Sequence, residues 1–196
     1  WLKSNIFYVK LSFFNNLCYY FVMKIYVVRH GTTVWNEKGI TQGQSQNRLS
    51  NKGKIEVKAV ATKTKNINFD VIFCSPLMRA VQTANIFNAF HKVKVIKDDR
   101  LIEMSQKQYT GKKFTDLTDE EKILRKQYKL DTNEIVFNNT KSFLDKLLSR
   151  NFYQSVLIVT HGRIASFIDY ILTNKKVNFG ENVNIFANGE IKQYEI

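Results

Sequence analysis

Five residues of the sequence belong to types that transfer phosphoryl groups, and they occur in four short segments. Arg29 and His30 are adjacent, Arg79 follows a Ser-Pro pair closely, Glu103 follows Leu-Ile, and His161 lies late in the chain. An arginine guanidinium is a planar fork that matches phosphate oxygens. A histidine ring nitrogen can accept a phosphoryl group, and a carboxyl group can protonate a departing oxygen. The set therefore predicts chemistry on a phosphate ester.

Glycines adjoin two of these residues. Gly31 follows His30 and Gly162 follows His161. Because glycine has no Cβ, a backbone amide at these positions can approach a bound anion. Each histidine also has an ordinary interpretation as a buried side chain with backbone partners, and Glu103 as an exposed loop carboxylate. The functional interpretation is favoured by the way the segments are placed.

The elements that must position these residues are short strands alternating with helices. Runs rich in β-branched residues at 25–29, 71–74, 93–96 and 156–160 predict buried strands. Helical spacing of apolar residues between them predicts covering helices, one of them capped by Ser50. This alternation predicts the α/β class, as a three-layer α/β/α sandwich with a mostly parallel central sheet. Ligands of such sheets bind beyond the carboxyl ends of the strands, where the candidate residues lie.

Two further regions are less regular. The polar stretch 104–139 predicts an excursion over the sheet edge with a short helix near 118–128, and apolar residues at 143–148 predict another helix. Segments 183–187 and 191–194, joined by an Asn-Gly pair, predict a closing β-hairpin.

Composition limits the classes to which the protein can belong. The chain has 196 residues, of which 44% are hydrophobic and 24% charged, with eight glycines and one proline. This is a globular composition of single-domain size, which excludes collagen-like and wholly disordered chains. The net charge of +13 suits a polyanion, an anionic membrane face or a small anionic substrate. Two cysteines form no disulfide framework and have no zinc-ligand spacing, so a reducing, cytoplasmic location is expected.

Residues 1–22 differ from the remainder of the chain. They are apolar and aromatic but interrupted by Lys10 and several asparagines, so they predict neither a membrane span nor a signal peptide. Met23 then precedes the first predicted strand as an initiator would. We therefore expect residues 1–22 to be an N-terminal extension outside the native fold and residues 23–196 to form one domain.

From about Met23 to the C-terminus the sequence resembles the histidine phosphatase superfamily, also called the phosphoglycerate mutase-like family. The resemblance depends on several ordered segments at strand ends. They are Arg29-His30-Gly31 continued by Thr33 and Asn36, Gly39-Ile40-Thr41-Gln42-Gly43, Leu49-Ser50 with Gly53, the stretch Ser-Pro-Leu-Met-Arg-Ala-Val-Gln-Thr-Ala at 75–84, and His161. An isolated Arg-His-Gly is weak evidence, whereas ordered segments of this kind are specific.

The resemblance implies a phosphohistidine mechanism. In it His30 attacks phosphorus, and Glu103 first protonates the departing alkoxide and then activates water. The groups that would hold the phosphoryl oxygens and neutralise their charge are Arg29, Arg79 and His161.

The resemblance also implies which residues surround the reacting groups. Asn36 is expected to hydrogen-bond the phosphate or the substrate, Thr41 and Gln42 to line the pocket mouth, and Gly162 to bind substrate through its backbone. No metal and no cofactor is required, because arginine and histidine supply the positive charge. The implied partner is a small phosphorylated substrate, with neither nucleic acid nor a membrane, and the oligomeric state stays open.

Details of the motifs indicate a branch and a reaction. The first histidine motif lacks the x-Arg-x-Pro continuation of the acid phosphatase branch, so the sequence resembles the mutase-like branch. The short span between Glu103 and His161 leaves room for only a small lid, which favours hydrolysis over phosphoglycerate mutase-type transfer. Several positions depart from the family pattern: Lys107 replaces a glycine after the acid, Gln46 an aspartate and Arg48 a common proline. Residues 137–140 replace the usual Pro-Gly-Glu-Ser-like segment.

Two alternatives come from other classes. Cys74 and Arg79 enclose four residues, one of them a proline, so they do not form the Cys-x5-Arg loop of thiol phosphatases, and Cys74 is expected to be a buried thiol. A non-catalytic phosphate- or nucleic-acid-binding protein would explain the positive charge. Lysine and arginine are scattered, however, without a dense basic tract.

Overall fold

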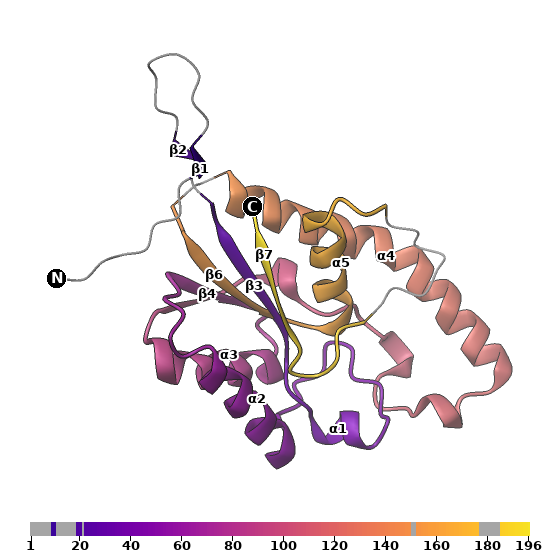
Figure 1. Cartoon of the computed structure of the whole chain (residues 1–196). Helices are drawn as coiled ribbons and strands as arrows, with labels where there is room; N and C mark the ends of the chain where they lie inside the picture. The colour runs from indigo at the N-terminus through magenta and orange to yellow at the C-terminus, as the bar shows by residue number, and fades with distance from the viewer. Residues whose placement is uncertain (1–8, 11–18, 21, 150–151, 177–184) are drawn as a thin grey trace.

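The computed structural model describes residues 9–10, 19–20, 22–149, 152–176 and 185–196. Its centre is a five-stranded sheet in the order β5-β4-β6-β3-β7 (Figure 1). The strands are β3 (Lys24–Arg29), β4 (Val71–Cys74), β5 (Lys94–Lys97), β6 (Ser155–Thr160) and β7 (Ile191–Glu195). The pairs β5–β4, β4–β6 and β6–β3 are parallel, and β7 pairs antiparallel with β3. The four predicted strands and the mostly parallel sheet are confirmed.

Helices cover both faces of this sheet, which completes the predicted three layers (Figure 1). Along β3, Ile25 and Val27 pack into one buried cluster, while Tyr26 and Val28 pack into the other, because successive side chains of a strand point to opposite faces. The first cluster includes side chains of α4 and α5, and the second those of α2 and α3. The four helices are α2 (Asn51–Lys63), α3 (Met78–His91), α4 (Asp119–Leu148) and α5 (Gly162–Leu172).

Short elements complete the described chain. They are α1 (Val34–Glu37), the 3₁₀ turns η1 (Asp99–Leu101), η2 (Lys107–Tyr109) and η3 (Phe114–Asp116), and a separate antiparallel pair of β1 (Val9–Lys10) and β2 (Tyr19–Tyr20). Met23 and Ile196 exchange two backbone hydrogen bonds of 2.9 and 3.0 Å, which ties the start of β3 to the end of β7. Whether residues 1–22 lie outside the native fold stays a prediction. No helix in the described part of the chain is long and apolar enough to cross a bilayer.

The helices predicted near 118–128 and at 143–148 are both helical, but their separation is wrong, because both belong to the 30-residue helix α4. The helix begins at a capping box. In it the Thr118 hydroxyl accepts from the Glu121 amide, and the Glu121 carboxylate accepts from the Thr118 amide. Neither glycine nor proline occurs between Gly111 and Gly162, so no residue of that kind interrupts the helix. The middle of α4 was assigned to an excursion because its residues are mostly polar and give no clear apolar periodicity.

The predicted closing hairpin is also wrong in its pairing. Its second strand exists as β7, but β7 pairs with β3 instead of the segment before the turn. Residues 185–187 are not in a strand, and residues 183–184 lie outside the described residues. At the turn Gly189 has a φ of +74°, and its amide donates to the Arg29 carbonyl over 3.2 Å. Strand β7 therefore pairs with the edge of β3 that β6 does not occupy.

Candidate active site

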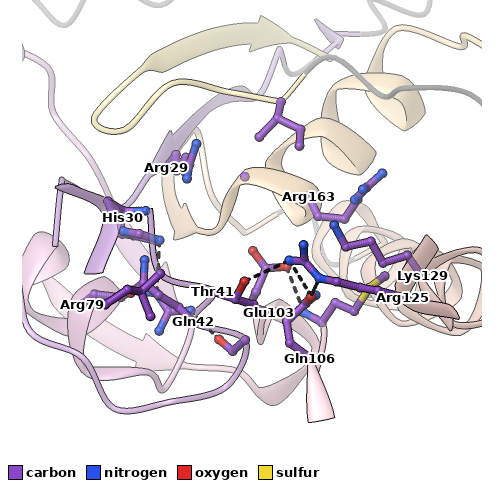
Figure 2. Close-up of a pocket in the computed structure, with 16 residues that line it drawn as sticks. Arg29, His30, Thr41, Gln42, Arg79, Glu103, Gln106, Arg125, Lys129 and Arg163 are labelled. Atoms are coloured by element: carbon purple, nitrogen blue, oxygen red, sulfur yellow. Dashed lines mark hydrogen bonds between the residues drawn. The ribbon is translucent and has the colours of Figure 1, made fainter. Parts of the chain in front are cut away.

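The candidate residues meet at the carboxyl edge of the sheet, where parallel strands end together. Arg29 is the last residue of β3, and Arg79 lies in the first turn of α3, which follows β4. Glu103 follows β5 and the turn η1, and His161 follows β6. A cavity of about 250 Å³ opens there and is lined by seven predicted residues besides Gly162 (Figure 2): Arg29, His30, Asn36, Thr41, Gln42, Arg79 and Glu103.

The tautomer of His30 follows from its two partners. Its Nδ1 lies 2.8 Å from the Gly31 carbonyl oxygen, which can only accept a hydrogen bond. Its Nε2 lies 3.1 Å from Nε of Arg79, which can only donate. The ring proton is therefore on Nδ1, and the lone pair of Nε2 accepts the hydrogen bond from Arg79. This is the nitrogen that can attack phosphorus.

The surroundings of His30 also keep this lone pair unprotonated. The side chain is buried, with 2% of its surface exposed. Burial, followed by the neighbouring cations Arg79 and Arg29, lowers the pKa of His30 well below its ordinary value of 6.5. The imidazole is neutral at pH 7, as a nucleophile must be.

Arg79 is held in place as a rigid donor. It is 1% exposed, and besides His30 it donates to the carbonyls of Gly43 and Ser45 over 2.7 and 2.8 Å. Three of its five N–H groups are used in this way, so two remain for a ligand oxygen. Burial lowers the pKa of Arg79 to about 10, and it stays charged at neutral pH. Arg79 is therefore an interior cation, although it lies on a helix.

Arg29 lines the cavity from the end of β3. Its Nη1 donates to the Phe186 carbonyl over 2.6 Å, while its buried Nε has no partner among the described residues. A Cβ on Gly162 would lie 3.3 Å from the Arg29 guanidinium and closer still to Ile185. Glycine at 162 therefore lets the start of α5 pack against Arg29 at the cavity wall.

His161 lies behind His30 and does not line the cavity. The two ring centroids are 5.1 Å apart, and His161 is fully buried. Its Nε2 is 2.8 Å from Oγ of Ser75, and its Nδ1 has no partner within the described residues. Burial, and after it Arg79, lowers the pKa of His161 well below 6.5, so this ring is also neutral. A direct contact of His161 with phosphate stays a prediction.

Glu103 contributes the carboxylate of the cavity wall (Figure 2). Its Oε1 accepts from the Met104 amide over 2.9 Å, and its backbone carbonyl accepts from the Gln44 side chain over 3.0 Å. The side chain is half-buried and lies among arginines: its charge acts on Arg29, Arg79 and Arg163. It is placed where it could serve a leaving group in the cavity.

The three predicted substrate contacts near His30 already have hydrogen-bond partners to different degrees. Oδ1 of Asn36 accepts from the amide and the hydroxyl of Thr33, so only its amide group is left for a ligand. Oγ1 of Thr41 accepts from Arg125 over 3.1 Å. Oε1 of Gln42 is buried and has no partner in the described part of the chain. Among Asn36, Thr41 and Gln42, only Gln42 has a buried side-chain oxygen without a donor in the described residues.

The expectation that the Gly31 amide approaches an anion is wrong. This amide donates to Oγ1 of Thr83 over 3.1 Å. A Cβ at Gly31 would meet Val57 and lie 2.9 Å from the Gly53 carbonyl. Glycine is needed here for the close approach of α2 to the end of β3, not for binding a ligand.

Sequence reasoning did not identify the cations on the opposite wall. Arg125 and Lys129 of α4 and Arg163 of α5 line the cavity, together with Gln106 (Figure 2). The spacing of Arg125 and Lys129 by four residues was a signal, since it places both on one face of a helix. That signal was lost because the helix itself was predicted to end near 128.

Two other chemistries were tested against the structure. Cys74 is a buried free thiol, and burial raises its pKa to about 11, so it does not form the thiolate of a thiol phosphatase. The described residues contain no cluster of three or more His, Cys, Asp or Glu side chains that could hold a metal ion.

Comparison with known proteins agrees with this geometry. Residues 25–196 match the family model described as histidine phosphatase superfamily (branch 1). The chain belongs to this superfamily. Within it, a phosphoserine phosphatase 1 of Hydrogenobacter thermophilus is 29% identical over 150 residues, which cover 71% of each chain. A probable phosphoglycerate mutase of Escherichia coli O1:K1 is 35% identical over 106 residues, which cover 54% of this chain and 49% of that protein.

A solved phosphatase structure has the same fold. The crystal structure of the alpha-ribazole phosphatase from Shigella flexneri superposes with a TM-score of 0.77, at 22% identity, and covers 87% of this chain and 89% of its own. At that identity the likeness shows the fold alone. Family and fold together place this chain in the histidine phosphatase superfamily, with a phosphoglycerate mutase-like fold.

Proposed function

We propose that this histidine phosphatase hydrolyses phosphomonoesters without a metal, through a phosphohistidine on Nε2 of His30. The observation that supports it most directly is the tautomer: the Nδ1 proton is held by the Gly31 carbonyl, and Nε2 faces the cavity side occupied by Arg79. A neutral imidazole with an oriented lone pair is the form that attacks phosphorus.

The proposed reaction has two steps. In the first, Nε2 gives up its hydrogen bond from Nε of Arg79 and its lone pair forms a bond to phosphorus while the P–O bond to the substrate breaks. Glu103 donates its proton to the departing oxygen. In the second, water attacks the phosphohistidine, Glu103 takes a proton from that water, and the P–N bond breaks to release inorganic phosphate. His30 and Glu103 then return to their starting protonation states.

Charge stabilisation in both steps comes from fixed groups. Within the described residues, Arg79 keeps two N–H donors without an acceptor, and Nε of Arg29 has no partner. The first amides of α5 begin at Gly162, which lines the cavity, and a helix N-terminus favours an anion. Because these donors are already oriented, they stabilise the transferring group without reorganisation.

The test is hydrolysis of 4-nitrophenyl phosphate in EDTA. We expect turnover by the wild type and a loss of at least about 10³-fold in kcat for His30→Ala, since the nucleophile is removed. His91→Gln is the matched control, because His91 lies on α3 outside the cavity lining, and it should stay within about twofold. Turnover that requires a metal, or that persists in His30→Ala, contradicts the proposal.

A second reaction of the same site is phosphoglycerate mutase-type transfer. It is favoured by the relative named as a mutase, but that match covers only 49% of the mutase. The match to the phosphoserine phosphatase covers 71% of that protein. The two are separated by supplying 3-phosphoglycerate with and without a bisphosphate primer. We expect phosphate release to exceed isomerisation, and primer-dependent isomerisation in excess would make the protein a mutase.

A further inference from the structure

Ser75 contacts His161, the second histidine of the site. Ser75 directly follows β4 and His161 directly follows β6, and these two strands are parallel neighbours. The Ser75 amide donates to the Val159 carbonyl over 3.0 Å, which continues the strand pairing beyond Cys74. This register brings the two side chains together, so that Oγ of Ser75 lies 2.8 Å from Nε2 of His161. The reaction proposed above gives Ser75 no role.

The direction of this hydrogen bond follows from the other partner of the hydroxyl. Ser75 and His161 are both 0% exposed. Oγ of Ser75 accepts from the Leu77 amide over 3.3 Å, and among the described residues only Nε2 of His161 can accept the hydroxyl proton. A buried hydroxyl that donates to nothing costs free energy. The Ser75 hydroxyl therefore donates, and Nε2 accepts.

This hydrogen bond determines the tautomer of His161. Burial, and after it the charge of Arg79, lowers the pKa of His161 well below 6.5, so the ring is neutral and carries one proton. Because Nε2 accepts, that proton is on Nδ1. The opposite tautomer would leave two buried groups without partners in the described residues, the hydroxyl proton and the Nδ1 lone pair. The tautomer with the proton on Nδ1 leaves only the Nδ1–H group.

The Nδ1–H group belongs to a ring beside the groups that are proposed to bind phosphate. The ring centroids of His161 and His30 are 5.1 Å apart, and the charges of Arg79 and Arg29 act on the His161 ring. The two nitrogens of an imidazole point in widely different directions, so Nδ1 faces away from Ser75. An N–H group attracts a phosphoryl oxygen, whereas a lone pair at the same place would repel it.

We infer that Ser75 is a positioning residue that holds the proton of His161 on Nδ1, so that this ring offers a donor to a phosphoryl group on His30. The inference rests on the proposed function. Neither Ser75 nor His161 lines the cavity. The donor therefore meets only an oxygen of a phosphoryl group already bound at His30, and Ser75 acts through His161 without taking part in bond breaking.

The first experiment observes the tautomer directly. The chain has three histidines, so a long-range 15N–1H correlation spectrum contains three imidazole rings, and His161→Gln identifies the signals of His161. In the wild type at pH 7.5 we expect the proton on Nδ1. In Ser75→Ala the donor to Nε2 is removed, so a protonated Nε2 should appear. Ser155→Ala is the matched control, because Ser155 is also buried but begins β6 at the end away from the cavity. It should keep the wild-type tautomer.

The second experiment is binding of inorganic phosphate, which tests the donor. Saturating phosphate should shift the Nδ1 proton signal of His161 in the wild type, because a hydrogen bond to a charged oxygen forms. The dissociation constant for phosphate should increase about tenfold in Ser75→Ala and stay within about twofold in Ser155→Ala. Neither the tautomer nor phosphate binding requires turnover. Both tests therefore decide the inference even if no ester is hydrolysed and the proposed function fails.

The third experiment tests whether Ser75 acts through His161. With 4-nitrophenyl phosphate, Ser75→Ala should lower kcat/KM about tenfold in the wild type but less than about twofold in His161→Gln, because residues that act as a unit are not additive. An equal loss in both backgrounds overturns the inference. A wild-type proton on Nε2, an unchanged tautomer in Ser75→Ala, or an Nδ1 signal that phosphate does not shift also overturns it.

Discussion

His30 combines two requirements that oppose each other at the scale of a single residue. A nucleophilic nitrogen has to be free of its proton, and the phosphoryl group that it receives needs positive charge nearby. Burial, and after it the charge of Arg79 and Arg29, lowers the pKa of the imidazole. In the proposed reaction the same two cations attract the phosphate oxygens. The Gly31 carbonyl accepts from Nδ1 of the ring and so keeps the ring proton on that nitrogen.

This coupling predicts the effect of removing one cation. In Arg79→Gln the pKa of His30 should rise towards 6.5, because a charge that disfavours the imidazolium is lost. The acid limb of kcat/KM should then move to higher pH while the rate falls, and the His30 ring signal in NMR should titrate in the same range. Arg100→Gln, whose guanidinium pairs with Asp98 outside the cavity lining, is the control and should leave the titration unchanged. An unaltered His30 titration in Arg79→Gln would show that burial alone lowers the pKa.

Lys107 shows how one substitution in a family pattern is accommodated. The resemblance places glycine at this position, and the backbone keeps the conformation that suits glycine, with a φ of +44°. The ammonium lies 4.7 Å from the centre of the Tyr128 ring of α4, which offsets part of the strain. The loop after Glu103 therefore keeps a glycine-like turn without its glycine.

Helix α4 serves two parts of the molecule at the scale of elements. Its C-terminal part anchors it to the sheet through the buried side chains of Phe143, Leu144 and Leu147. Its N-terminal half leaves the core and brings Arg125 and Lys129 to the cavity, with apolar side chains such as Ile123 exposed on its outer side. Since this half has few core contacts, its first turn depends on local capping.

The capping box of α4 gives the second prediction. Thr118→Ala removes the bond to the Glu121 amide and should lower the free energy of unfolding by about 1 kcal/mol. Hydrogen exchange should become faster in the first turns of α4 and stay unchanged near Leu144. Thr62→Ala is the control, because the Thr62 hydroxyl bonds within α2 to the Lys58 carbonyl and caps nothing. Uniformly faster exchange along α4 would contradict a local role.

At the scale of the whole molecule, two neutral imidazoles are buried beneath a cationic cavity. His30 and His161 are 2% and 0% exposed, and the pKa of each is lowered well below 6.5. In the unfolded chain both rings protonate near their ordinary pKa. The unfolded state therefore binds more protons than the native state at mildly acidic pH, which makes stability increase with pH.

The third prediction is an acid-sensitive fold. As the pH falls below about 6.5, the free energy of unfolding should decrease by up to ~1.4 kcal/mol per pH unit for each of these histidines. Urea unfolding between pH 7.5 and 5.5 measures this slope, and the upper part of the range precedes most carboxylate titration. The double variant His30→Gln with His161→Gln should have a flatter slope whatever its absolute stability. An equal slope in wild type and variant would show that other groups cause the acid sensitivity.

Sequence and structure agree best where the signal is local. Strands β3, β4 and β6 were predictable because each is a short run rich in β-branched residues, and burial on both faces of a parallel sheet demands such runs. The edge strand β5 is only partly buried and was predictable from its β-branched residues alone. The helix α2 was predictable from Ser50, whose side chain accepts from the Gly53 amide. The long helix α4 was not, because its N-terminal half is polar, and its helical state depends on a capping box and on continuity with a buried C-terminal part.

The order of the motifs along the chain determined the family, the sheet and which side chains stand at its carboxyl edge. These follow from short segments, since a strand and the residues after it are neighbours in sequence. Only the tertiary structure decided the tautomer of His30 and the position of His161 behind it. It also decided that Arg125, Lys129 and Arg163 line the cavity. His30 and Arg79 are 49 positions apart, and Thr41 and Arg125 are 84 apart. Protonation and charge balance depend on such distant contacts, because they are set by whatever the fold brings within a few ångströms.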